Sequence, residues 1–197
     1  MPRGTTPPES TRRLFFALWP DETMRQAMAQ PTRKAARASG GRPVPADNLH
    51  VTLAFLGSVP ERRLPRLAEI ARAAAKAAGE APGGKLAGGG SPGDALELIF
   101  DRLEYWRAAH LLCALPSEPP SAAATLARAL QDLLAADGFA TDLKPFRPHV
   151  TLVRKVARPG PAGNMHPVLW RFTELALVES RTLPEGALYS VVESYRF

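Results

Sequence analysis

The tetrapeptide His-Val-Thr-Leu occurs twice in this 197-residue chain, at 50–53 and at 149–152. The chain has four histidines, so half of them stand in this one motif. Because the ordinary pKa of histidine is about 6.5, one imidazole can accept a proton at neutral pH while another donates one. A hydroxyl beside each ring can donate a hydrogen bond to a phosphate oxygen. Two such pairs in one cleft match the requirements of phosphodiester cleavage without a metal.

Both tetrapeptides are predicted to lie on β-strands, where successive side chains point to opposite faces. His50 and Thr52 then share one face, with the Val and Leu of the motif in the core. His149 and Thr151 share a face in the same way. Arg154 is a candidate phosphate clamp, because a guanidinium matches phosphate geometry. On a regular strand Arg154 would lie opposite Thr151, so this role requires a bend in the strand.

The repetition extends beyond the motif. The first copy follows a predicted strand at 12–20, a helix and a proline-containing loop. The second follows a predicted strand at 110–116, a helix at 121–138 and another proline-containing loop. A lone His-x-Thr on a strand is usually structural, whereas two copies in matching strand–helix–strand units indicate an internal duplication. An approximate twofold axis would bring the two motifs face to face across one cleft.

Further secondary-structure elements are predicted from capping residues, from Gly and Pro positions, and from the spacing of apolar residues. Matching the Ala-Leu pairs of the first strands aligns Ala17 with Ala114, which precede their motif histidines by 33 and 35 residues. Asp21 is predicted to cap the first helix, and Pro31 to kink or end it. Further predicted segments are a loop at 41–48, a motif strand closed by Gly57, a helix at 61–79, a flexible Gly- and Pro-rich loop at 79–93, and strands at 95–100, 168–180 and 187–197.

Composition sets the broad class. We expect a flexible N-terminal tail at 1–11, without the apolar core of a signal peptide, and one bilobal domain at 12–197. No apolar run approaches the roughly 18–20 residues that span a bilayer. The single cysteine, Cys113, is predicted to be a buried thiol in a cytoplasmic protein. The net charge of +6 suits an RNA partner, although 20 Arg among 25 basic residues also fits a GC-rich coding bias.

Other chemistries find weaker support. Each motif supplies one histidine, with no second ligand two or four residues on, so no metal is expected. The chain contains neither a phosphate-binding P-loop nor a Gly-x-Ser-x-Gly nucleophile motif. His110 and His166 are interpreted as incidental, and Arg147 and Lys155 as solvated surface charges.

The paired motifs, with the segments RLFFAL, GRPVPADNLHVTLAFLG, FRPHVTLVR and WRFTELALVES, resemble the 2H phosphoesterases. Within them the sequence is similar to the bacterial RNA 2′,3′-cyclic phosphodiesterases, also called 2′-5′ RNA ligases. The resemblance covers residues 12–197. It implies an α+β, bilobal fold in which two antiparallel sheets flank a central cleft, with a pseudo-twofold axis and helices outside. It also implies that no cofactor or metal takes part.

The resemblance further implies hydrolysis of a 2′,3′-cyclic phosphate at an RNA 3′ end to a 2′-phosphate. His50 would be the proton donor and His149 the proton acceptor, with Thr52 and Thr151 binding phosphate oxygens. Expected partners are RNA ends, tRNA fragments among them, with the protein a monomer and no membrane involved. Reversible 2′-5′ ligation would be the same chemistry with a sugar hydroxyl in place of water. Two alternatives stay open: a phosphodiesterase for small cyclic nucleotides, and an RNA- or nucleotide-binding module without turnover.

Overall fold

A computed structural model describes residues 9–80, 95–118, 121–140, 145–158, 162–184 and 186–197. The predicted tail at 1–11 lies mostly outside the described residues, and so does nearly all of the predicted loop at 79–93. The strands are β1 (Thr11–Leu18), β2 (Arg42–Pro43), β3 (Val51–Pro60), β4 (Leu96–Trp106), β5 (Leu111–Leu115), β6 (Val150–Arg154), β7 (Gly163–Phe172), β8 (Glu174–Leu183) and β9 (Gly186–Arg196). The α-helices are α1 (Glu22–Ser39), α2 (Leu64–Glu80) and α3 (Ser121–Ala136); the short 3₁₀ helices are η1 (Ala46–Asn48), η2 (Glu61–Arg63) and η3 (Arg107–Ala109).

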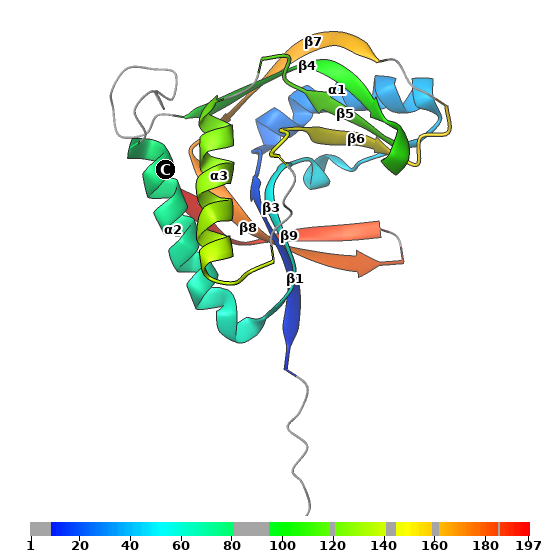
Figure 1. The fold of residues 1–197 in the computed structure, drawn as a ribbon. Coiled ribbons are helices and arrows are strands. Elements are labelled where there is room, and N and C mark those ends of the chain that lie inside the picture. The colour runs from blue at the N-terminus through cyan, green and yellow to red at the C-terminus, as the bar shows by residue number, and fades with distance from the viewer. Residues whose placement is uncertain (1–8, 81–94, 119–120, 141–144, 159–161, 185) are drawn as a thin grey trace, which may run out of the picture.

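The strands form two antiparallel sheets, one above the other in Figure 1. The four-stranded sheet has the order β3-β1-β8-β9, and the five-stranded sheet has the order β2-β6-β5-β4-β7. The predicted duplication is present in both: β1 pairs with β3 across α1, and β5 pairs with β6 across α3. The expected α+β fold with two antiparallel sheets is therefore confirmed.

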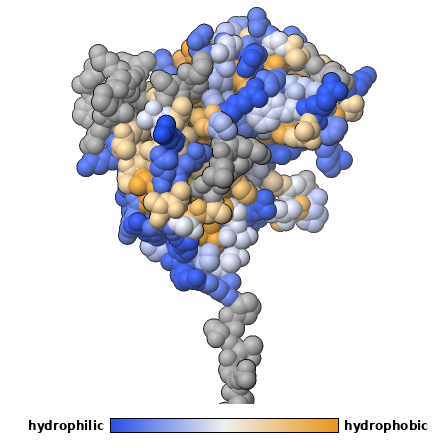
Figure 2. Space-filling model, viewed as in Figure 1, coloured by the Kyte–Doolittle hydropathy of each residue, from blue (hydrophilic) through white to orange (hydrophobic). Residues whose placement is uncertain are grey.

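The helices cover the sheet faces that point away from the cleft. Helix α1 packs against β6 and β7 of the five-stranded sheet, where the Trp170 indole donates to the Met24 carbonyl at 2.8 Å. Helices α2 and α3 pack together and cover the four-stranded sheet (Figure 1). Figure 2 shows hydrophilic and hydrophobic residues mixed over the upper part of the molecule, where the five-stranded sheet lies. In the described residues no helix is both long and apolar enough to span a membrane.

Both motif strands carry a β-bulge at the same place. On β3 the partners of Phe16 and Ala17 are Ala54 and Thr52, which leaves Leu53 as the extra residue. On β6 the partners of Leu112 and Cys113 are Val153 and Thr151, so Leu152 is the extra residue. A bulge bends its strand and shifts the alternation of side chains by one position. The residues after each bulge therefore change faces.

Several sequence expectations are corrected. Pro31 does not end α1, which continues to Ser39. The helix continues because its buried stripe, with Met28 before Pro31 and Ala35 after it, packs against the five-stranded sheet. Strand β3 passes through Gly57, which has φ of +69°, and continues to Pro60. The loop at 41–48 contains the edge strand β2 and the helix η1. The predicted strand at 168–180 belongs to two strands, which part at residue 173 and join different sheets. The expected cap is present at Asp21, whose side chain accepts from the Met24 amide at 2.8 Å.

Candidate active site

Both motifs face one cleft between the sheets, with a volume of about 240 Å³. His50 and Thr52 line it from the four-stranded sheet, while Val51 and Leu53 are buried in the core behind them. His149 and Thr151 line it from the five-stranded sheet in the same manner. The remaining lining residues are Arg13, Phe15, Val44, Asn48, Phe55, Leu111, Arg154, Ser180 and Tyr189. The alternation predicted for the tetrapeptides therefore describes the cleft correctly.

The same local hydrogen bond orients both imidazoles. Nδ1 of His50 lies 2.8 Å from the carbonyl oxygen of Asn48, and Nδ1 of His149 lies 2.8 Å from that of Arg147. A carbonyl oxygen only accepts, so Nδ1 carries the proton in each ring when the bond is made. Within the described residues, Nε2 of neither ring makes a hydrogen bond, so both can exchange a proton with a ligand.

The residues that supply these carbonyls are tethered by their own side chains. The Asn48 amide donates to the carbonyl of Ala187 on β9 at 2.8 Å. The Arg147 guanidinium donates to the Glu104 carboxylate on β4 at 2.6 Å, so Arg147 is ion-paired rather than a purely solvated charge. Each histidine is thus oriented by the carbonyl of a residue whose own side chain is hydrogen-bonded to another strand.

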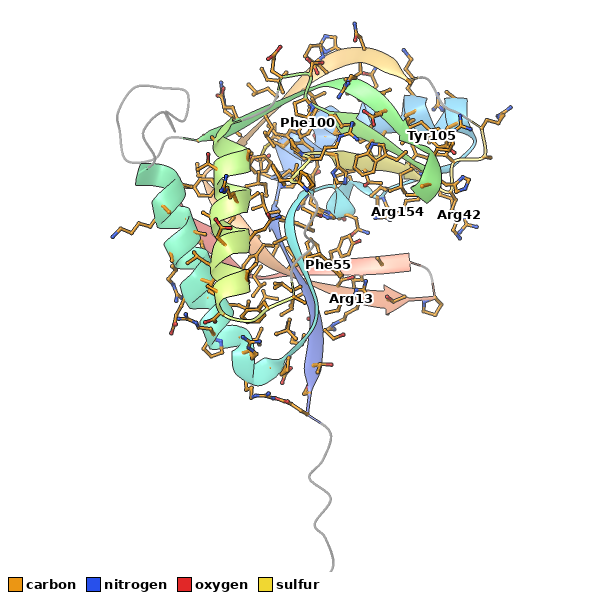
Figure 3. The ribbon with its side chains drawn as sticks, in the orientation of Figure 1. Arg13, Arg42, Phe55, Phe100, Tyr105 and Arg154 are labelled. Atoms are coloured by element: carbon orange, nitrogen blue, oxygen red, sulfur yellow. The ribbon has the colours of Figure 1, made fainter. Side chains whose placement is uncertain are left out.

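The bulges bring Arg154 and Phe55 to the cleft. Each residue stands five positions after its motif histidine and two positions after the extra residue of the bulge, so the two occupy equivalent places in the duplication. The Phe55 side chain is 40% exposed, and the Arg13 guanidinium lies 4.9 Å from the centre of its ring. Figure 3 labels Arg13 and Phe55 on the four-stranded sheet and Arg154 on the five-stranded sheet. The bend that the Arg154 prediction required is the bulge at Leu152.

Aromatic rings surround the two histidines unequally. Phe15, Trp19 and Tyr189 lie 5.0, 5.5 and 5.2 Å from the imidazole centre of His50, and the indole of Trp19 is stacked on it. In the described residues, His149 has one such neighbour, Trp106, at 4.4 Å. An aromatic face within about 6 Å stabilises a cation, so a protonated His50 would gain more from its surroundings.

Burial shifts the proton equilibria of both rings. Loss of hydration lowers the pKa of His50 to about 4, and the positive charges of Arg154 and His149 act in the same direction. The pKa of His149 is lowered by burial first, and then by the nearby guanidinium groups of Arg147 and Arg154. Both imidazoles are therefore predominantly neutral in the unliganded protein at neutral pH. An anion in the cleft would reverse part of this shift by stabilising the imidazolium forms.

Cys113 is fully buried, as expected, and lies next to the site. Its Sγ is 3.9 Å from Oγ1 of Thr151, and burial raises the pKa of the thiol to about 12. Because Cys113 is the strand partner of Thr151 and Ala17 is the partner of Thr52, the structural equivalent of Ala17 is Cys113. Matching the Ala-Leu pairs in the sequence aligns Ala17 with Ala114 instead, which is one residue off. In the described residues no cluster of three or more His, Cys, Asp or Glu could hold a metal ion.

Several lining residues escaped the sequence analysis. Arg13 and Phe15 alternate with core residues on β1, so strand parity alone carried a signal for them. Tyr189 lies on β9, almost 140 residues after His50 in the chain, and β9 brings it into contact with His50. No local sequence pattern predicts this contact. His110 and His166 do not line the cleft, in agreement with their interpretation as incidental.

A duplicated α+β fold in which each sheet presents a His-x-Thr motif to one cleft defines the class of two-histidine phosphoesterases. The chain belongs to this class, in the family of LigT-like phosphoesterases. The family model described as LigT like Phosphoesterase matches residues 18–82. The RNA 2′,3′-cyclic phosphodiesterase of Thermus thermophilus is 32% identical over 192 residues, which is 93% of this chain and 89% of that protein. The enzyme of the same name from Escherichia coli is 31% identical, over 82% of this chain and 85% of its own.

Solved structures agree with the sequence relatives. The crystal structure of Escherichia coli LigT complexed with 3′-AMP is 26% identical, with a TM-score of 0.77 over 95% of this chain and 99% of that one. The structure of TT0787 from Thermus thermophilus is 29% identical, with a TM-score of 0.64 over 93% and 97% of the two chains.

Proposed function

We propose that this protein hydrolyses 2′,3′-cyclic phosphates at RNA 3′ ends to 2′-phosphates by acid–base catalysis with two histidines and no metal. The observation that carries the proposal is the pair of imidazoles that line one cleft, each with its Nδ1 bonded to a backbone carbonyl and its Nε2 free. The names of the two bacterial relatives support the substrate class.

In the proposed mechanism, Nε2 of His149 takes a proton from water, and the resulting oxygen forms a bond to phosphorus. The bond from phosphorus to the 3′-oxygen breaks, and His50 gives the proton on its Nε2 to that leaving oxygen. The phosphate stays on the 2′-oxygen. Thr52 and Thr151 donate to the non-bridging oxygens, and Arg154 neutralises their charge.

The surroundings of the two rings support this division of roles. The guanidinium of Arg147 favours a neutral His149, as a base requires. Once a phosphate anion is bound in the cleft, the stacked indole of Trp19 adds to the stabilisation of a His50 imidazolium, as an acid requires. Because the pKa of His50 is about 4 without ligand, its protonation must accompany binding of the phosphate anion.

Phe55 is proposed to stack on the terminal nucleobase, because it is an exposed ring at the edge of the cleft. An aromatic face binds any base with little sequence preference. Structures of the Escherichia coli relative with 3′-AMP, ATP and phosphate support a site for nucleotides and phosphate groups.

The deciding experiment is incubation with an oligoribonucleotide that ends in a 2′,3′-cyclic phosphate, in the presence of EDTA. We expect a 2′-phosphate product, with the position of the phosphate determined by NMR. A 3′-phosphate product would contradict the assignment of the leaving oxygen, and binding without any product would favour a module without turnover. Adding an RNA with a 5′-hydroxyl tests for 2′-5′ ligation in the same tube.

We further propose that the enzyme acts as a monomer in the cytoplasm on RNA ends that include tRNA fragments. The cleft is lined from both sheets of one chain, so no second copy is needed to supply its residues. A single buried cysteine fits a reducing compartment. Light scattering of the purified protein tests the monomer.

A further inference from the structure

Two arginines lie side by side at the outer edge of the five-stranded sheet. Arg42 on β2 is the direct cross-strand partner of Arg154 on β6, and both side chains are exposed. Strand β2 is the edge strand of this sheet, so no further strand covers Arg42. Figure 3 shows both arginines at the right-hand side of the sheet, with Arg13 and Phe55 below them. Of the two, Arg154 lines the cleft.

This pair of like charges is unfavourable as it stands. Cross-strand partners have Cβ atoms about 4.5–5.5 Å apart, and like charges in that position destabilise a sheet. Elsewhere in the same sheet the corresponding position holds an acid: Arg171 faces Glu97, and their side chains are 2.6 Å apart. In the described part of the chain, neither Arg42 nor Arg154 has an ion pair or a hydrogen bond from its side chain. Two adjacent cations without a carboxylate are suited to two anionic groups of one ligand.

We propose that Arg42 binds the RNA phosphate next to the cyclic one, while Arg154 binds the cyclic phosphate itself. The proposal rests on the proposed function and deepens it, because it makes an oligonucleotide a better substrate than a mononucleotide. A cyclic phosphate at a 3′ end has chain on one side only, so its neighbouring phosphate is the one 5′ of the terminal nucleoside. Strand β2 is the edge strand beside β6, and both of its residues are exposed, so we place the path of the RNA chain out of the cleft over this edge.

The test compares two substrates: a 2′,3′-cyclic mononucleotide without a 5′-phosphate, and a trinucleotide ending in a 2′,3′-cyclic phosphate. We expect Arg42→Gln to lower kcat/KM for the trinucleotide by about tenfold or more, as for loss of one charge-assisted hydrogen bond. The loss for the mononucleotide should be under about threefold. The slope of log kcat/KM against log salt for the trinucleotide should become about 0.7 less steep, the value for one phosphate contact of a single strand. Arg42→Lys should restore part of the trinucleotide rate.

The matched control is Arg128→Gln, which removes the same charge from an exposed residue on α3, a helix that packs on the other sheet. It should leave both rates as in the unmodified protein. Equal losses on the two substrates, or no loss on the trinucleotide, would overturn the role of Arg42 while leaving the hydrolytic function intact. Failure of the unmodified protein to hydrolyse either substrate would instead refute the proposed function, and this inference with it.

Discussion

The two halves of the cleft share a scaffold and differ in the side chains placed on it. Each half presents a His-x-Thr motif on a strand, a bulge at the following Leu, and a backbone carbonyl that accepts from the imidazole. Past the bulge the halves diverge, with Phe55 on one side and Arg154 on the other. The shared parts are those that orient an imidazole, and both the acid and the base need them. The divergent parts match the substrate proposed above, which is itself unsymmetrical, with a nucleobase on one side and phosphates on the other.

Substitution of the two histidines, which both halves share, should have the largest effect on activity. We expect His50→Ala and His149→Ala each to lower kcat by about 10²–10⁴-fold, the usual contribution of general acid–base catalysis. Because both groups act in one proton-transfer sequence, the double variant should lose much less than the product of the single losses. Steady-state rates on a cyclic-phosphate trinucleotide check this. Full activity in either single variant would refute a two-histidine mechanism.

Substitutions at the equivalent positions Phe55 and Arg154 should change different kinetic parameters. Arg154→Gln should lower kcat by about 10- to 100-fold, since it removes a charge-assisted hydrogen bond to the reacting phosphate. Phe55→Ala should raise KM by about tenfold, because stacking on a base is worth about 1–3 kcal/mol, while kcat stays within about threefold. Separate determination of kcat and KM distinguishes the two. If both variants changed the same parameter, the two positions would not have diverged in role.

The pH dependence separates the free protein from its complex. With the pKa of both histidines lowered in the free protein, kcat/KM should follow a bell-shaped profile with its optimum below pH 6.5. A bound phosphate anion stabilises both imidazolium forms and raises both pKa values, so the optimum of kcat should lie at higher pH. NMR titration of the His50 ring should show a pKa of about 4, which rises on addition of inorganic phosphate. Identical profiles for the two parameters would contradict this account.

The smallest effect is expected where the halves differ behind the site. Cys113→Ala copies the residue that the other half has at Ala17, so it should change kcat by less than about threefold. It should lower the free energy of unfolding by about 1 kcal/mol, because a small buried side chain is removed. A thiol that is buried and has a pKa of about 12 should also resist alkylation by iodoacetamide in the folded protein. Rapid inactivation by that reagent would contradict the buried placement.

Sequence reasoning predicted the repeated, regular parts of the site. Among the irregular parts it proposed Arg154 on condition of a bend in the strand, and it missed Phe55 and Tyr189. Alternation along a strand was enough to place His50 and Thr52 in the cleft, since the tetrapeptide precedes the bulge. Arg154 lies beyond the bulge, where one extra residue reverses the alternation without any change in composition. The prediction for Arg154 therefore depended on a bend that the sequence does not show, and Phe55, at the equivalent position, was missed. Tyr189 reaches the site through the pairing of β8 with β9, which depends on the whole sheet.

The exchange of helices between the sheets also determines how the chain folds. Helix α1 follows β1 of the four-stranded sheet but covers the five-stranded one, and α3 does the reverse. The strands are interleaved as well, since β2 joins the second sheet and β8 and β9 join the first. The first 80 residues alone would leave the apolar face of α1 in water, and so would not form a separable folding unit. Unfolding should therefore occur as one cooperative transition, and a chain cut in the segment between α2 and β4 should regain its fold only when both fragments are present together.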